Sequence, residues 1–314
     1  MPELHDERTD AQIAELEDWA TATYGSVSVR FTEGVKGRTK RRYMVSVDGQ
    51  PEQDWPSVTS VIGKHFEKGG LAMWAELETI KGCAALIENA EEIKELPTDP
   101  KKLGGALYAM GQTPNQIRDA AGLQGNVIHQ AVEDWFNHGQ IPDLSLVPAE
   151  KRGKMQALAA FLIDVRPKLI ASEPPIVSLT HQYTGRPDLL ATCEGNPRVP
   201  VQVAVKKGSA SRMGWMPEGT VLFDFKSGNS LHQDMGVQLG MYEQGLNECG
   251  FPDVDWRIVV HLRDDGYALH AFPDSRPIVP HLMGLYRTFL SLNKAKTNLN
   301  RSLLLEPEPA EAVA

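Results

Sequence analysis

The chain has 314 residues, of which 41% are hydrophobic and 23% are charged, an ordinary composition for a globular protein. Its formal net charge is −9, from 32 basic and 41 acidic side chains, which argues mildly against a protein that coats nucleic acid non-specifically. No apolar stretch approaches the about 20 residues needed to cross a bilayer, and three dispersed cysteines without a CxxC pair argue against a zinc ribbon or an iron–sulfur cluster.

Residues 1–55 are predicted to form a helix followed by a basic β-hairpin. Residues 8–24 have apolar positions at helical spacing, whereas residues 26–30 and 43–47 both alternate as strands do. The segment between the two strands contains glycine and carries a cluster of basic residues, among them Arg38, Lys40, Arg41 and Arg42. Such a cluster is either a track for DNA phosphates or a solvated loop.

Residues 56–300 are predicted to form one mixed domain, in which helices come first and strands follow. Apolar periodicity predicts helices at residues 71–96, 114–139, 149–170, 234–248 and 276–297. Alternation and short apolar runs predict strands at residues 176–183, 188–192, 221–225, 256–262 and 267–272. Residues 193–219 are expected to be an insertion, as a surface loop or a small hairpin, and residues 301–314 a disordered tail. This order favours an α/β (mixed α+β) core with a helical N-terminal portion.

The tripeptide Asp224-Phe225-Lys226, which closes an apolar run, is the most informative motif. Because side chains on a strand alternate between faces, Asp224 and Lys226 should point the same way while Phe225 enters the core. A carboxylate and an ammonium on one rigid strand suit a site that holds a divalent cation and a fixed positive charge beside one phosphate. Taken alone, the motif could equally be a surface ion pair.

Three further motifs contain candidate functional residues. Asp188 ends a GRPD segment before an apolar strand, although an aspartate after proline is often a residue that caps backbone amides in a turn. His129 ends a GNVIH segment in a predicted helix, where a lone histidine is more often packed or exposed than a ligand. Gln238 and Tyr242 lie four residues apart, and therefore on one face of a predicted helix, where ordinary surface polarity is the alternative.

Taken together, the motifs are more specific than any one of them. In chain order they read GxxxH, GRPD before an apolar strand, DFK after one, and QLGMY. This order resembles the RecB-like exonuclease branch of the PD-(D/E)XK nuclease superfamily, which includes phage recombination exonucleases and CRISPR-associated RecB-like nucleases. The resemblance covers roughly residues 57–246 and implies a restriction-endonuclease-like core, with a central mixed β-sheet flanked by helices. The CRISPR-associated members usually carry four cysteines that this chain does not match, so no iron–sulfur cluster is expected.

The resemblance also implies a role for each motif. The implied ligands of Mg²⁺ or Mn²⁺ are the side chains of His129, Asp188 and Asp224 and the carbonyl of Phe225. Lys226 would be the catalytic lysine, and Gln238 and Tyr242 would support the site and contact DNA. Carboxylate oxygens suit either ion, and a single imidazole is compatible with Mn²⁺.

The implied activity is that of a metal-dependent DNA exonuclease of phage type, which hydrolyses phosphodiester bonds at DNA ends in recombination or end processing. An endonuclease of the same fold, specific for flaps or other structures, is the alternative. A non-catalytic DNA-binding module ranks below both, because degenerate nuclease domains typically lose their charged ligands.

The expected partners are single- or double-stranded DNA ends, with a single-strand annealing or recombination protein and further copies of the chain as candidates. The expected location is the cytoplasm, which would be the host cytoplasm for a phage-encoded chain. Two features support this expectation, since the acidic N-terminal segment lacks the apolar core of a secretory signal and the dispersed cysteines suit a reduced compartment.

Overall fold

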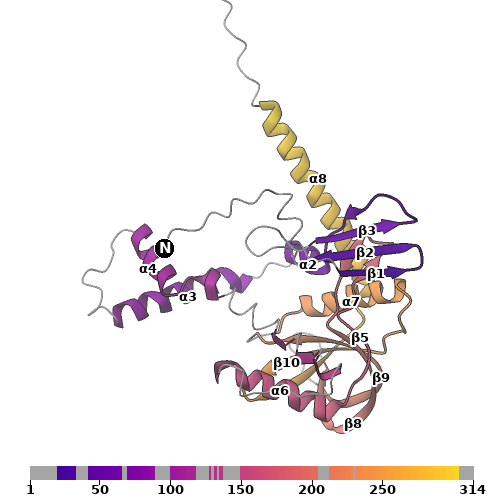
Figure 1. Ribbon diagram of the computed structural model, residues 1–314. Helices are drawn as coiled ribbons and strands as arrows, with labels where there is room; N and C mark the ends of the chain where they lie inside the picture. Colours follow the sequence, from indigo (N-terminus) through magenta and orange to yellow (C-terminus); the bar gives the residue numbers. More distant parts are fainter. Residues whose placement is uncertain are drawn as a thin grey trace, which may run out of the picture.

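The computed structural model describes residues 20–32, 42–65, 69–88, 100–117, 127–128, 131–132, 134–136, 149–203, 212–228 and 231–303. These residues form the mixed α/β fold that the sequence predicts, with a small N-terminal sheet and a larger central sheet (Figure 1). Within this part of the chain, no helix combines the length and the apolar character needed to cross a membrane.

Four short antiparallel strands form the N-terminal sheet. In sheet order they are β1 (Ala20–Tyr24), β2 (Val27–Thr32), β3 (Arg42–Val47) and β4 (Gln53–Asp54). The hairpin of β2 and β3 is therefore confirmed, but the helix expected at residues 8–24 is wrong over residues 20–24, while residues 8–19 lie outside the described residues. The physical reason is pairing: Gly25, at a φ of +60°, turns the chain so that β1 pairs with β2 and partly buries Ala22 and Tyr24.

The central sheet has five strands in the order β11-β10-β9-β8-β5. Their bounds are β5 (Lys168–Ser172), β8 (Leu189–Val203), β9 (Arg212–Lys226), β10 (Trp256–Arg263) and β11 (Gly266–Phe272). The pairs β8–β9 and β10–β11 are antiparallel hairpins, and β9 pairs with β10 in parallel. The far part of β8 also pairs with β11, so the sheet curls back on itself.

The predicted insertion at residues 193–219 is not a loop over most of its length. It continues β8 and β9 into one long hairpin, with a register shift between Asn196 and Pro200, and only residues 204–211 between the strands lie outside the described residues. The extension is ordered because Val199, Val201 and Met216 are buried in the same core as the centre of the sheet. The hairpin alternative is therefore correct, and the loop alternative is wrong.

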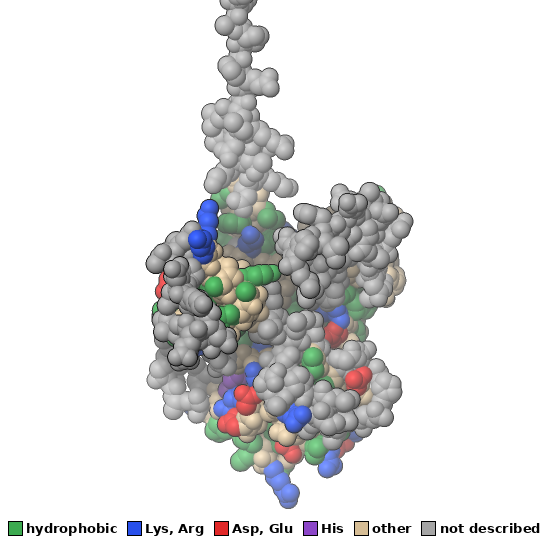
Figure 2. All heavy atoms as spheres, turned by 60° about the vertical axis from the view of Figure 1, so that its left-hand side comes forward, with side chains coloured by type: hydrophobic (Ala, Val, Ile, Leu, Met, Phe, Trp, Pro, Cys, Tyr) green, Lys and Arg blue, Asp and Glu red, His purple; other side chains and the backbone are tan. Residues whose placement is uncertain are grey.

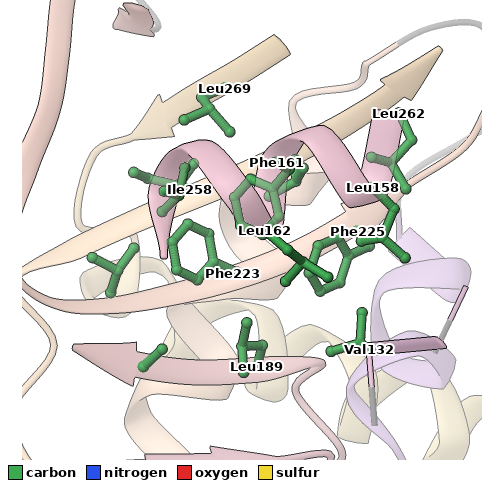
Figure 3. Close-up of a cluster of buried hydrophobic side chains, with 14 of the residues drawn as sticks. Val132, Leu158, Phe161, Leu162, Leu189, Phe223, Phe225, Ile258, Leu262 and Leu269 are labelled. Atoms are coloured by element: carbon green, nitrogen blue, oxygen red, sulfur yellow. The ribbon is translucent and has the colours of Figure 1, made fainter. Parts of the chain in front are cut away.

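Helices cover both faces of the central sheet. The helix α6 (Ala149–Val165) packs on one face, where the Phe161 ring makes edge-on contacts with the rings of Phe223 and Phe225 at centroid distances of 5.3 and 5.6 Å (Figure 3). The helix α7 (Asp234–Glu248) packs on the other face, against a cluster that includes Leu222. In Figure 1, α7 lies between the central and N-terminal sheets.

The remaining helices surround this core. They are α2 (Val58–His65), α3 (Gly69–Glu88), α4 (Pro100–Ala109), the 3₁₀-helix η1 (Arg276–Ile278) and α8 (Val279–Leu303). Residues of α2 and α8 join the α7-side cluster. Because α8 runs to Leu303, the expected disordered tail is wrong over residues 301–303, and residues 304–314 lie outside the described residues.

Two predicted boundaries are wrong for local reasons. The helix expected at residues 149–170 ends at Val165, because Arg166 has a φ of +50° and Pro167 cannot continue a helix. The strand expected at residues 176–183 is instead a hairpin of β6 (Ile176–Ser178) and β7 (Tyr183–Gly185). The chain reverses between these strands, with Gln182 at a φ of +55°.

Candidate active site at the end of strand β9

The two candidate aspartates lie side by side at the ends of paired strands. Leu189, the first residue of β8, pairs with Phe223 of the antiparallel strand β9. Asp188 and Asp224, which flank this pair, therefore lie next to each other. The contact is fixed by a hydrogen bond, because the backbone N–H of Phe225 donates to Asp188 Oδ2 at 2.7 Å. Asp188 therefore orients its carboxylate by binding the backbone of the DFK motif itself.

The predicted alternation of side chains along β9 is present. Phe223 and Phe225 enter the core under α6, whereas Asp224 faces α7 and is only 1% exposed. Lys226, whose side chain is 26% exposed, places Nζ 2.6 Å from Asp224 Oδ2. A buried carboxylate and a partly exposed ammonium thus form an ion pair at the end of a rigid strand, as the motif predicts.

The helix α7 brings the other two motif residues to the same carboxylate. The Gln238 Nε2 group donates to Asp224 Oδ1 at 3.1 Å and to the Tyr242 hydroxyl oxygen at 3.1 Å. Tyr242 is buried in the α7-side core. Gln238 therefore bridges Asp224 and Tyr242, and the alternative of ordinary surface polarity is wrong for both residues of α7.

Contacts with β7 and β10 hold α7 in place beside Asp224. The Tyr183 hydroxyl donates to the backbone carbonyl of Met241 at 2.7 Å. On the other side, the buried Glu243 carboxylate pairs with both branches of the Arg257 guanidinium. These two anchors flank Tyr242 in sequence, so they fix the part of the helix that supports Asp224.

Gly185 of the GRPD segment has a packing role that the sequence did not reveal. A Cβ atom at this position would lie 2.8 Å from Cε1 of Tyr242, well inside van der Waals contact. The glycine is thus required for the close approach of β7 to the Tyr242 ring rather than for a turn. The neighbouring Arg186 stacks its guanidinium over the Phe31 ring at 4.3 Å, and so joins the segment to the N-terminal sheet.

Burial and the charges of Asp188 and Asp224 set the protonation states of Lys226 and Tyr242. Burial alone would lower the pKa of the Lys226 ammonium, but the charges of Asp224 and Asp188 outweigh it and raise the pKa above its usual value. Burial, followed by the charges of the same two aspartates, raises the pKa of Tyr242 well above its usual value. Near neutral pH, Lys226 is therefore a cation and Tyr242 a neutral hydroxyl.

One acidic residue of this site was missed by the sequence reasoning. Asp234 begins α7, and its charge also contributes to the raised pKa of Lys226. Its spacing was the available signal, because Asp234, Gln238 and Tyr242 follow one another at intervals of four residues and so share one helix face.

The donor set can be tested against the implied divalent cation. The Asp224 Oδ2 atom is buried, and its charge is compensated by the Lys226 ammonium at 2.6 Å. A buried carboxylate of this kind, with the Asp188 carboxylate beside it, fits a hard cation that prefers oxygen ligands. Within the described part of the chain no group of three His, Cys, Asp or Glu side chains is placed to bind a metal.

Two other predicted groups are only partly covered by the structure. His129, the third implied ligand, lies outside the described residues. Ile128 and Val132 are buried in the core that contains Phe225, and Figure 3 labels Val132 and Phe225 in this cluster. Arg38, Lys40 and Arg41 also lie outside them. Arg42 is described and begins β3, opposite Thr32.

No protein-family model matches the chain, and no curated protein matches it either. The implied nuclease relationship therefore rests on the four ordered motifs and on the arrangement of the residues they contain.

Proposed function

We propose that the chain is a metal-dependent deoxyribonuclease, and specifically an exonuclease that hydrolyses phosphodiester bonds at DNA ends. One observation carries the proposal: Asp188 and Asp224 lie together at the ends of paired strands, with a lysine cation beside a buried oxygen of Asp224. We further propose that the central sheet with α6 and α7 is a PD-(D/E)XK core, since the GRPD segment leads into β8, the DFK motif ends β9 and the QLGMY motif lies on α7, in the expected order.

In this proposal the two aspartates, together with His129 and the Phe225 carbonyl, would hold Mg²⁺ or Mn²⁺. A bound ion of this kind supplies a water of lowered pKa and offsets charge on the phosphoryl oxygens. Asp188 is prepared for this role because the Phe225 N–H fixes one of its oxygens and thereby orients the other. Gln238 does the same for Asp224 by donating to Oδ1, while Oδ2 faces the Lys226 ammonium.

Lys226 would act as a positive charge beside the reacting phosphate. The charges of Asp224 and Asp188 raise the pKa of its ammonium, which favours the protonated form near neutral pH. A protonated Lys226 can orient an attacking water and stabilise the negative charge that develops on the phosphoryl group. Tyr242, also protonated, would keep Gln238 in place beside Asp224.

The basic loop would contribute a phosphate track through Arg38, Lys40, Arg41 and Arg42. Arg42 begins β3, and the sheet that contains β3 is joined to the GRPD segment by the contact of the Arg186 guanidinium with the Phe31 ring. On the face of the molecule in Figure 2, the described Lys and Arg side chains are interspersed with Asp and Glu side chains. A local track, rather than an overall positive charge, is therefore the form of DNA contact that we propose.

The test is digestion of end-labelled linear single-stranded and double-stranded DNA with Mg²⁺ or Mn²⁺, alongside a covalently closed circle. An exonuclease degrades the linear DNA, spares the circle and stops when EDTA is added. Degradation of the circle would support the alternative, a structure-specific endonuclease with the same site. Binding of DNA without cleavage under either ion would support the non-catalytic module.

Two variants with matched controls tie the activity to this site. Asp224→Asn and Lys226→Ala should each remove cleavage, whereas the exposed residues Asp253 and Lys168 can be changed to Asn and Ala without effect. Full activity in both site variants would overturn the proposed function. In cells, we propose a cytoplasmic protein that acts on DNA ends with a recombination or annealing partner, and co-purification from a cytoplasmic extract tests that part.

A further inference from the structure

The last helix, α8, carries an apolar stripe that continues beyond the core on which the helix is anchored. Its first turns pack into the α7-side cluster, where Leu282 is only 5% exposed. Beyond Tyr286 the helix leaves this cluster, residues 287–292 are all exposed, and α8 projects away from both sheets in Figure 1. Leu285 and Leu292 are 62% and 65% exposed, so large apolar side chains face outwards along the projecting part.

Two contacts fix the direction in which α8 leaves the core. The Arg287 guanidinium donates to the backbone carbonyl of His181 at 2.9 Å. One turn away, the Lys64 ammonium of α2 lies 5.5 Å from the centroid of the Phe289 ring, which is still 40% exposed. The projecting helix is therefore held at its base, and its apolar stripe is presented in a defined direction.

The stripe has the seven-residue period of a coiled coil. We call it the seam, and its members alternate at spacings of three and four residues: Leu282, Leu285, Phe289, Leu292, Lys296, Leu299 and Leu303. A surface helix that only covers a globular core follows a period of 3.6 residues, whereas a period of 3.5 suits a second helix. In heptad notation the seam has leucine at every d position and a single lysine, Lys296, at an a position.

The charges of α8 indicate which helix would pair with it. Arg287, Lys294 and Arg301 recur every seven residues at f positions, which lie opposite a seam and stay in water when helices pair. The e and g positions that flank the seam contain no Lys, Arg, Asp or Glu; they are His281, Tyr286, Thr288, Asn293, Ala295, Asn300 and Ser302. Basic flanks would select an acidic partner, but uncharged flanks do not prevent two identical helices from pairing.

A partner would also stabilise the projecting helix. A short helix in water is marginal by itself, and most helical stability in proteins comes from packing of an apolar face. Pairing would remove Leu285 and Leu292 from water, and both sides of the pair would gain equally because the same stripe meets itself. A single lysine at an a position lowers the stability of such a pair but restricts its register and the number of helices in it.

We propose that α8 is a self-association element, in which residues 285–303 form a two-stranded coiled coil with the same helix of a second copy of the chain. This inference does not depend on the proposed nuclease activity, because it concerns a surface outside the candidate site. It assigns a particular surface to the contact between copies.

The test is sedimentation velocity of the full chain over a series of protein concentrations, without DNA or metal. The mass should rise with concentration from the 34.6 kDa of one chain to twice that value. Leu292→Glu places a charge in the seam of both helices, so it should raise the dissociation constant by about 100-fold or more. Leu285→Glu, one heptad position earlier, should have the same effect.

The same helix provides a matched control and a variant with the opposite effect. Leu290→Glu makes the identical change at a b position, outside the seam, and should leave the dissociation constant within about 3-fold. Lys296→Leu makes the seam apolar throughout and should tighten association by about 10-fold or more. Circular dichroism and thermal unfolding check that each variant is folded.

Each other outcome overturns the inference. A mass of one chain at every concentration would mean that the seam does not pair with itself. Equal weakening by Leu292→Glu and Leu290→Glu would show association through another surface, and so would association that neither change affects. A mass of three or more chains would exclude the two-stranded arrangement. Failure to cleave DNA would overturn only the proposed function, because association is measured without substrate.

Discussion

The two faces of strand β9 are buried almost equally, yet their chemistry differs. Towards α6, Phe223 and Phe225 pack against Phe161 in an entirely apolar core. Towards α7, Leu222 is followed by Asp224, whose carboxylate is met by Gln238 and Lys226. One face therefore stabilises the fold, while the other gives up some of that stability to keep charged groups in a defined arrangement.

The largest effects should separate these faces in a pair of variants. Phe161→Ala removes a fully buried ring and should lower the free energy of unfolding by about 3–5 kcal/mol, with activity per folded molecule retained. Asp224→Asn should lower kcat by about 1,000-fold or more, with little loss of stability because the amide keeps the shape of the carboxylate. Urea unfolding and single-turnover cleavage measure the two quantities. The comparison would fail if Asp224→Asn unfolded as easily as Phe161→Ala.

Lys226→Ala tests the cost of the charge on the α7 face. The variant leaves the buried Asp224 carboxylate without its cation, so the free energy of unfolding in EDTA should fall by about 2–3 kcal/mol. Adding Mg²⁺ should restore part of the loss, because a bound cation again compensates the carboxylate. Thermal unfolding with EDTA or Mg²⁺ checks both steps. A loss that Mg²⁺ leaves unchanged would argue against cation binding at Asp224.

Gln238→Ala removes the bridge between Asp224 and Tyr242. Because outer partners of a ligand orient it, we expect a loss of about 10- to 100-fold in cation affinity or activity. Calorimetry with Mn²⁺ gives the affinity, and Gln244→Ala is a matched control, because this glutamine of the same helix donates to Glu248 instead of Asp224. An unchanged affinity would reduce Gln238 to a packing residue.

Gly185→Ala tests how closely β7 must approach the site. The added methyl group would collide with the Tyr242 ring, so a loss of about 1–2 kcal/mol is expected, together with reduced activity. Gly104→Ala is the control, because no atom lies within 4 Å of its Cβ position and alanine favours the helix by up to about 1 kcal/mol. Denaturant midpoints of the two variants should therefore shift in opposite directions.

The smallest expected effect is a pH dependence of stability from β11. Burial, and then the charges of His261 and Arg263, lower the pKa of His270. The unfolded chain therefore takes up a proton more readily, and stability should fall as the pH drops below about 6.5. Thermal unfolding between neutral and mildly acidic pH should show a shallower decline for His270→Gln. Identical profiles for the unmodified protein and His270→Gln would show that His270 does not contribute to the pH dependence.

The sequence predicted those parts of the molecule that depend on local patterns. The bounds of α7 and the β10–β11 hairpin follow from periodicity and from a turn sequence, and both agree with the structure. The side-chain directions of Asp224, Phe225 and Lys226 follow from strand alternation alone. Errors occurred where tertiary pairing decided the outcome: residues 20–24 are a strand because β2 pairs with them, and residues 193–203 and 212–219 belong to strands because the core accepts their side chains.

The sequence by itself determined which chemical groups this protein can bring to a site, and in what order, because those groups are fixed by residue identity and by strand and helix periods. Only the tertiary structure decided that Asp188 binds the backbone of Phe225, that Gln238 reaches Asp224, and that Gly185 must be small. The physical reason is that contacts between residues distant in the chain depend on how sheets and helices pack, and no local pattern encodes that packing.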